Sequence, residues 1–451
     1  MTTIDDRPAS PPALGPDGAW LTHDRLGMFV HWGLYALPAR HEWVKSNERM
    51  GDAEYQRYFD RFDPDHYEPR EWARAAKAAG MGYVVLTAKH HDGFCLWDSA
   101  LTDYKITNTP YGRDAVGPYV EACRAAGLKV GLYYSLIDWH HEEFPVDGTH
   151  PQRDDEEFKT RAAGRDIRLY REYLHGQVRE LLTSYGRIDY LFFDFSYEHR
   201  IDYWGGKGAA DWGSEDLLGM IRELQPGIIV NDRLGIPGDL VTPEQYQPVR
   251  AMERGGRPVV WEACQTLNGS WGYHRDNLDF KSPETLVRLL VDGVSKGGNL
   301  LLNVGPNGRG RIEPRAAETL AALGAWMDDH ERAIRGAGPA PFAPPVDARY
   351  TLRGDRLYVH LFAWPYKHLH LEGLADRVVY AQLMTDASEI RVEHIDPKRP
   401  PQNTQMGGQP AGTLTLQLPV QRPDTLVPVI ELFLSDPAEI SGGTTLDEED
   451  E

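Results

Sequence analysis

The sequence predicts an α/β protein, a (β/α)8-like barrel of the TIM type with a C-terminal antiparallel β-sandwich domain. Strand-like apolar runs alternate with helical segments from Leu26 to Ile334, which is typical of a parallel barrel. The Gly- and Pro-rich stretch over 336–346 ends this alternation. Only short strand-like runs separated by turn residues follow it, and this pattern indicates a small sandwich.

The length of 451 residues suits a barrel of about 250 residues or more plus a smaller module. We divide the chain into an N-terminal extension over 1–19, the barrel over 20–335, a linker over 336–346, the sandwich over 347–436 and a tail over 437–451. The tail ends in five consecutive acidic residues, so we expect it to be disordered.

The expected elements follow from hydrophobic periodicity and from helix-end signals. Barrel strands are expected over 26–30, 83–88, 128–135, 190–193, 227–230, 258–261 and 299–304, and sandwich strands over 357–362, 378–384, 413–418 and 427–434. Helices are expected over 68–80, 113–127, 165–185, 214–225 and 314–334, and from 282 onward. Gly80 and Gly127 stand where C-terminal helix caps belong, and Ser282 followed by Pro283 is typical of a helix start.

Composition excludes several classes of partner. The formal net charge of −20 argues against nucleic acid and anionic membranes, which require clustered Lys and Arg. Cys95, Cys123 and Cys264 are too few and too far apart for a disulfide framework or a zinc ribbon. The N-terminus has acids and prolines where a signal peptide needs a basic start and an apolar core, and no run approaches about 18 apolar residues. We expect a soluble, cytoplasmic protein.

Asp194 is the first candidate catalytic residue. It ends the uncharged run Tyr190 to Phe193, and barrels carry their chemistry at the C-terminal ends of strands. A helix-capping Asp would give the same local pattern. Other strand ends also carry polar residues, with an acidic and aromatic pair on a loop; these residues are His31, Glu42, Trp43, His90, His91, Tyr134, Arg233 and Glu262.

Two acids among residues that bind hydroxyl groups suit glycoside cleavage, in which one carboxylate attacks and the other supplies a proton. On this basis Asp194 and Glu262 form the expected pair. The adjacent His90 and His91 suggest a metal, but neighbours on an extended chain point to opposite sides and no HExxH spacing is present. We therefore expect neither a metal nor another cofactor.

Eight motifs in a fixed order carry a family resemblance. They are Gly27 to Gly33, Glu42-Trp43, Thr87 to Phe94, Leu132 to Ser135, Phe193-Asp194, Asn231 to Arg233, Trp261-Glu262 through Ser270 to Tyr273, and Asn299 to Pro306. Over about residues 20 to 335 the chain resembles the α-L-fucosidases of glycoside hydrolase family 29.

The resemblance implies release of terminal L-fucose, with retention of configuration, from a fucosylated oligosaccharide or glycoside. It also implies that Asp194 is the nucleophile and Glu262 the acid/base. The implied fucose contacts are His31, Glu42, Trp43, His90, His91, Tyr134 and Arg233, with Phe192 and Trp271 as aromatic pocket positions for the methyl group of fucose.

The chain departs from the family pattern directly after the predicted nucleophile. The family usually has Gly there, whereas this chain has Phe195, followed by Tyr197 and Glu198. We therefore expect a reshaped mouth of the site. Glu198 is a rival nucleophile, but Asp194 closes a packed strand and is better fixed for attack.

Two other functions are compatible with the same residues. One is a metal-dependent hydrolase that uses His31, His90, His91 and Asp194, which a chelator would inactivate. The other is a barrel that binds sugar without cleaving it. Turnover of an aryl α-L-fucoside would separate the second alternative from both enzymes.

Overall fold

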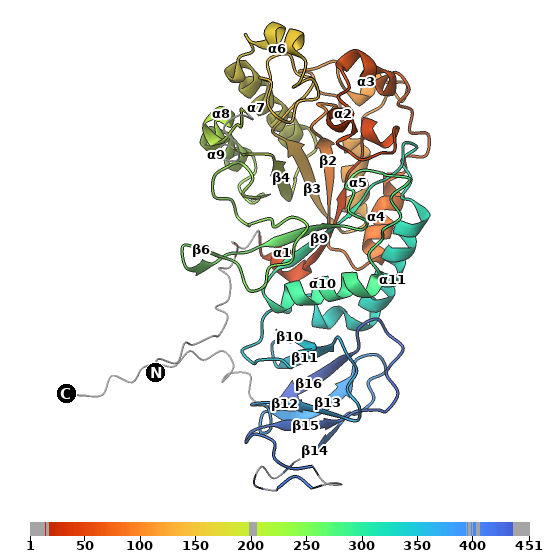
Figure 1. Cartoon of the computed structure of the whole chain (residues 1–451), viewed down its shortest axis with the longest axis vertical. Helices are drawn as coiled ribbons and strands as arrows, with labels where there is room; N and C mark the ends of the chain where they lie inside the picture. The colour runs from red at the N-terminus through yellow and green to blue at the C-terminus, as the bar shows by residue number, and fades with distance from the viewer. Residues whose placement is uncertain are drawn as a thin grey trace, which may run out of the picture.

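The structure is a computed structural model that describes residues 14, 18–197, 205–393, 395, 398, 400–402 and 406–435. Strands surrounded by helices form the upper part in Figure 1, and strands alone form the lower part. This arrangement is the predicted barrel with a C-terminal sandwich. Most of the predicted N-terminal extension, the acidic tail and Glu198 lie outside the described residues.

Seven parallel strands curl into a half-barrel in the order β5-β4-β3-β2-β1-β9-β8. The strands are β1 (Leu26–Val30), β2 (Tyr83–Lys89), β3 (Lys129–Ser135), β4 (Tyr190–Asp194), β5 (Ile229–Val230), β8 (Glu262–Thr266) and β9 (Asn299–Val304). Six of them overlap a predicted run. The exception is β8, which begins where the run predicted over 258–261 was expected to end.

An irregular segment over 239–245 spans the gap between β5 and β8. On one side Asp239 N–H donates to Val230 O at 2.8 Å, and Leu240 forms a bridge with Asn231. On the other side Val241 forms a parallel bridge with Trp261. The segment therefore takes the place of a strand, and the barrel closes through it.

Helices cover the outside of the barrel (Figure 1). They are α1 (Ala19–Asp24), α2 (Val44–Asn47), α3 (Asp52–Phe59), α4 (Pro69–Ala78), α5 (Val116–Ala125), α6 (Glu156–Ala162), α7 (Ile167–Ser184), α8 (Ala209–Trp212), α9 (Ser214–Leu224), α10 (Pro283–Ser295) and α11 (Pro314–His330), with short 3-10 turns η1 (Leu34–Ala36), η2 (Ile106–Asn108) and η4 (Glu331–Ala333). As predicted, Ser282 caps α10 by accepting a hydrogen bond from Thr285 N–H at 3.1 Å.

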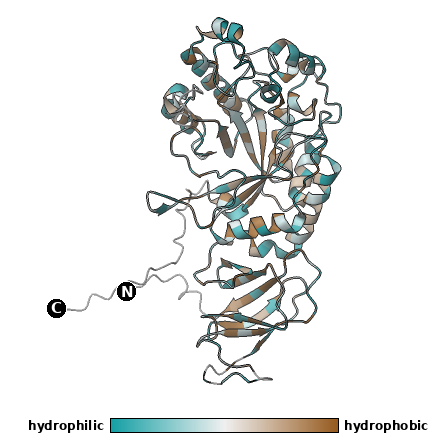
Figure 2. Cartoon of the chain, viewed as in Figure 1, coloured by the Kyte–Doolittle hydropathy of each residue, from teal (hydrophilic) through white to brown (hydrophobic). Residues whose placement is uncertain are grey.

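The sandwich consists of two antiparallel sheets, ordered β10-β11-β16-β13 and β12-β15-β14. Its strands are β10 (Ala348–Arg353), β11 (Arg356–Leu361), β12 (His368–Leu371), β13 (Val378–Leu383), β14 (Arg391–Glu393), β15 (Leu414–Gln417) and β16 (Val429–Leu434), and a separate hairpin pairs β6 (Glu253–Arg254) with β7 (Arg257–Pro258). Apolar residues concentrate on the strands of both parts (Figure 2). Trp326 of α11 donates to Val427 O at 2.9 Å, which joins the sandwich to the barrel.

Glu262 lies inside the barrel, at the N-terminal start of β8 rather than at a C-terminal strand end. It is completely buried, and Tyr83 and Tyr190, at the starts of β2 and β4, donate their hydroxyl groups to its carboxylate. Burial raises its pKa to about 7, although both hydroxyl groups oppose this shift. The predicted place of Glu262 among the catalytic strand ends is therefore wrong.

The substitution Glu262→Gln should raise stability more at neutral than at acidic pH. The folded chain keeps this proton up to a pKa of about 7, whereas the unfolded chain loses it near the ordinary glutamate pKa of 4.5, so the stability of the wild-type chain falls as the pH rises from 4.5 to 7. Gln avoids this loss, and its advantage in unfolding free energy should grow by about 2 to 3 kcal/mol from pH 4.5 to pH 7. Urea unfolding at several pH values measures it. The exposed Glu253→Gln is the control, and an advantage independent of pH would contradict the assignment.

Candidate active site

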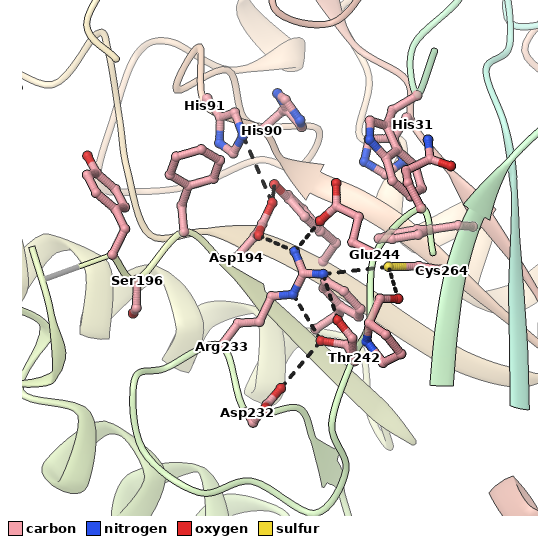
Figure 3. Close-up of a pocket in the computed structure, with 18 of the residues that line it drawn as sticks. His31, His90, His91, Asp194, Ser196, Asp232, Arg233, Thr242, Glu244 and Cys264 are labelled. Atoms are coloured by element: carbon pink, nitrogen blue, oxygen red, sulfur yellow. Dashed lines mark hydrogen bonds and ion pairs between the residues drawn. The ribbon is translucent and has the colours of Figure 1, made fainter. Parts of the chain in front are cut away.

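A cavity of about 790 Å³ opens at the C-terminal ends of the barrel strands. Of the residues predicted for the site, His31, Trp43, His90, His91, Phe192, Asp194, Arg233 and Trp271 line it. Glu42, Tyr134 and Glu262 do not. Figure 3 shows Asp194, Arg233 and Glu244 meeting in the middle, with the three histidines along one edge.

Asp194 is held by three neighbours. Arg233 Nη1 donates to Oδ1 at 2.7 Å, and the Tyr133 hydroxyl group donates to Oδ2 at 2.8 Å. His91 Nε2 lies 4.0 Å from Oδ2. Burial alone would raise the pKa of Asp194, but the charge of Arg233 and these hydrogen bonds lower it below its ordinary value. Asp194 is therefore an ionised carboxylate with a fixed orientation.

Glu244 is a second lining carboxylate that contacts Arg233, and it is not among the residues predicted from the sequence. It lies on the segment that closes the barrel, where a bridge to Cys264 of β8 fixes its backbone. Its Oε2 accepts from the same Nη1 atom of Arg233, also at 2.7 Å, and its side chain is 41% exposed. This residue therefore combines proximity to Asp194 with access to solvent.

Arg233 is fixed independently of the two carboxylates. Its Nε donates to Thr242 Oγ1 at 2.9 Å and its Nη2 to Thr242 O at 3.0 Å. Its guanidinium also lies 5.1 Å from the ring centre of Phe192. The cation consequently keeps its place when either carboxylate changes charge.

The three histidines form one wall of the cavity. The ring centres of His90 and His91 are 4.0 Å apart, and those of His31 and His90 are 5.6 Å apart. The expectation that His90 and His91 point to opposite sides is wrong, because β2 ends at Lys89 and strand alternation does not continue through them. Burial lowers all three pKa values, to about 3 for His31 and about 4 for His91, so the rings are neutral near pH 7.

Glu42 lies behind the cavity wall. Its Oε2 accepts from the backbone N–H groups of Trp271 at 3.1 Å and Gly272 at 2.8 Å. Oε1 has no hydrogen-bond donor within the described residues. Burial raises its pKa to about 7, although the two backbone N–H groups oppose this. Glu42 therefore orients Trp271, which lines the cavity 5.1 Å from the ring of His31.

The structure assigns Tyr133, not Tyr134, to the cavity. Successive side chains of a strand alternate between the two sides, and Tyr133 is the inward residue of β3. Tyr134 faces the helices, where its hydroxyl group donates to Gln177 Oε1 of α7 at 2.8 Å. The period of two could have revealed that only one of the pair faces inward.

Phe195 has a left-handed backbone, with φ of 81°. This conformation suits Gly, which the family that the chain resembles usually has after its nucleophile. A bulky side chain adopts it only under strain. The Phe195 ring lines the cavity and contacts His91 and Trp43 at centroid distances of 4.7 and 5.3 Å. The expected change at the mouth is thus an added aromatic ring.

Within the described ranges, no group of three or more His, Cys, Asp or Glu side chains is arranged to hold a metal ion. No helix in that part of the chain is both long and apolar enough to cross a membrane.

Comparison with known proteins gives one consistent family. The model for Alpha-L-fucosidase matches residues 15–332. Tissue alpha-L-fucosidase of Homo sapiens is 29% identical over 379 residues, covering 78% of this chain and 76% of the human protein. Plasma alpha-L-fucosidase of Rattus norvegicus is 28% identical, covering 90% of this chain and 88% of the rat protein.

Solved structures agree over nearly the whole chain. Alpha-L-fucosidase isoenzyme 1 from Paenibacillus thiaminolyticus has a TM-score of 0.86 and 46% identity, covering 93% of this chain and 99% of that one. An α-L-fucosidase from Bacteroides thetaiotaomicron, trapped as a covalent intermediate with 2-fluoro-fucosyl fluoride, has a TM-score of 0.80 and 27% identity, covering 97% and 100%. These matches confirm the resemblance, and the chain belongs to the α-L-fucosidase family of glycoside hydrolases.

Proposed function

We propose that this chain hydrolyses terminal α-L-fucosides with retention of configuration, with Asp194 as the nucleophile and Glu244 as the general acid and base. The observation that carries the proposal is the shared Arg233 Nη1 atom, which lies 2.7 Å from one oxygen of each carboxylate. The two oxygens are therefore at most twice that distance apart. Retaining glycosidases place their carboxyl groups about 5 to 5.5 Å apart, whereas inverting enzymes need about 6.5 to 9.5 Å.

In the first step Asp194 attacks the anomeric carbon while Glu244 protonates the leaving oxygen. Asp194 suits attack because its low pKa keeps it ionised and Tyr133 and Arg233 fix its orientation. To act as the acid, Glu244 must carry a proton and exchange its contact with Arg233 for the leaving oxygen. Its 41% exposure allows this movement.

In the second step water releases the sugar, and Glu244 acts as the base. The covalent bond to the sugar has by then removed the charge of Asp194. Among the described residues Arg233, which Thr242 holds in place, then has Glu244 as its one charged partner. This favours the ionised form of Glu244 that the base requires.

The remaining wall of the cavity suits a deoxy sugar. The neutral rings of His31, His90 and His91 can donate or accept hydrogen bonds with sugar hydroxyl groups. His90 Nδ1 has no partner within the described residues and is available for this role. Phe192 and Trp271 supply apolar surface for the methyl group of fucose. The covalent intermediate trapped in the Bacteroides thetaiotaomicron relative supports the same route here.

The variant Asp194→Gly tests the nucleophile. It should lower turnover of an aryl α-L-fucoside by at least about a thousand-fold, because no group remains to form the covalent intermediate. Added azide should restore part of the activity and yield a fucosyl azide of inverted anomeric configuration, identified by NMR. An Asp194→Gly enzyme that stays active without azide would contradict the assignment.

The variant Glu244→Gln tests the acid/base. It should slow substrates with poor leaving groups by about 100-fold or more and slow aryl fucosides with activated leaving groups much less in the first step, because these need little protonation. The basic limb of the pH profile of kcat/KM should disappear. Glu262→Gln is the matched control and should keep its activity, since Glu262 does not reach the cavity. The reverse result for the two variants would return the role to Glu262.

A further inference from the structure

Several aromatic side chains line the cavity without a role in the chemistry above, and two of them lie close in sequence to the two proposed catalytic carboxylates. Phe195 directly follows Asp194, and Tyr246 stands two residues after Glu244. We propose that Phe195 and Tyr246 form the binding site of the leaving group, and that this site takes a neutral sugar or aryl ring. The inference rests on the proposed function and defines which fucosides the enzyme prefers.

Tyr246 is available to a ligand. It lines the cavity, yet it is 54% exposed. In the described part of the chain its ring has no stacking partner and its hydroxyl group no hydrogen bond. An aromatic ring with a polar tip suits the mixed surface of a sugar, whose C–H groups pack on the ring face while its hydroxyl groups stay in water.

Gln245 fixes the position of Tyr246. Its φ of 58° is left-handed, and its contacts stabilise this conformation. Its backbone N–H donates to Cys264 O at 3.0 Å, and its Nε2 donates to Thr266 Oγ1 at 2.8 Å. The segment that carries Glu244 into the cavity is thereby anchored on β8 just before Tyr246. Because Glu244 protonates the leaving oxygen, the leaving group lies beside this anchored ring.

Phe195 is fixed by bonds on both sides. Before it, Asp194 O accepts from Leu136 N–H at 3.0 Å, and after it, Tyr197 N–H donates to Lys207 O at 3.0 Å. The Phe195 ring also packs edge-on against Tyr197 at a centroid distance of 5.2 Å. A bulky residue kept at a strained position beside a nucleophile points to a function for its side chain.

The charges of the cavity indicate a neutral leaving group. Among its described lining residues Arg233 alone carries a permanent positive charge, and both catalytic carboxylates already pair with it. Asp232 adds another carboxylate to the lining, and it pairs at 3.3 Å with Arg254, which does not line the cavity. An anionic leaving group would meet these acids without a cation of its own.

The experiment compares kcat/KM for leaving groups with and without a ring. The substrates are α-L-fucosyl fluoride, an aryl α-L-fucoside and an α-L-fucosylated neutral oligosaccharide. Tyr246→Ala and Phe195→Gly should each lower kcat/KM by about three- to ten-fold for the two substrates whose leaving group contains a ring. For the fluoride each should lower kcat/KM by less than about two-fold. Gly accepts a φ of 81°, so Phe195→Gly keeps the backbone. Tyr366→Ala, at an 82% exposed position, is the control and should leave kcat/KM unchanged for all three substrates.

Equal losses on all three substrates, with unchanged melting temperatures, would overturn the leaving-group site and leave the proposed function intact. Unchanged kcat/KM of both variants for the substrates whose leaving group contains a ring would overturn the leaving-group site as well. A wild-type enzyme that fails to hydrolyse even α-L-fucosyl fluoride would instead refute the proposed function. An oligosaccharide that is sulfated on the leaving sugar should react more slowly than its neutral counterpart, and equal or faster turnover would overturn the preference for a neutral group.

Discussion

The active site depends on one cation shared between two carboxylates. Arg233 reaches both Asp194 and Glu244 through a single nitrogen atom, and Thr242 fixes the guanidinium from the opposite side. This sharing sets the distance between the carboxylates and keeps Asp194 ionised despite its burial. It also couples their charges, because neutralising one carboxylate leaves the cation to the other. A retaining mechanism requires both the short distance and this alternation of charge.

The barrel closes through an irregular segment, and the position of Glu244 follows from this. The segment over 239–245 bridges β5 and β8 with isolated pairs rather than a continuous ladder. A regular strand would alternate its side chains strictly between the cavity and the helices. The irregular backbone, with Gln245 in a left-handed conformation, instead lines the cavity with every residue over 241–246, including Glu244 and Tyr246. Local strain thus contributes to the geometry of the site.

Glu262 and Asp194 lie at opposite ends of the barrel strands, and their surroundings shift their pKa values in opposite directions. Glu262 lies at the start of β8 among tyrosine hydroxyl groups, so burial dominates and its pKa rises to about 7. Asp194 lies at the end of β4, where Arg233 outweighs the same effect of burial. Below a pH of about 7 Glu262 is therefore mainly a neutral acid in the barrel interior, whereas Asp194 at the rim is ionised. The two ends of the strands therefore differ in chemistry as well as in accessibility.

The sequence by itself determined the barrel, the sandwich and most of the polar residues around the cavity, because hydrophobic periodicity and strand ends are local properties of the chain. Asp194 was identifiable in this way, since it ends an uninterrupted apolar run. Only the tertiary structure decided that Tyr133 faces the cavity, because both sides of a barrel strand are buried and apolar patterning cannot distinguish them. Only the tertiary structure revealed Glu244, because its segment has no strand pattern and reaches Asp194 through pairings with β5 and β8 that are distant in the sequence.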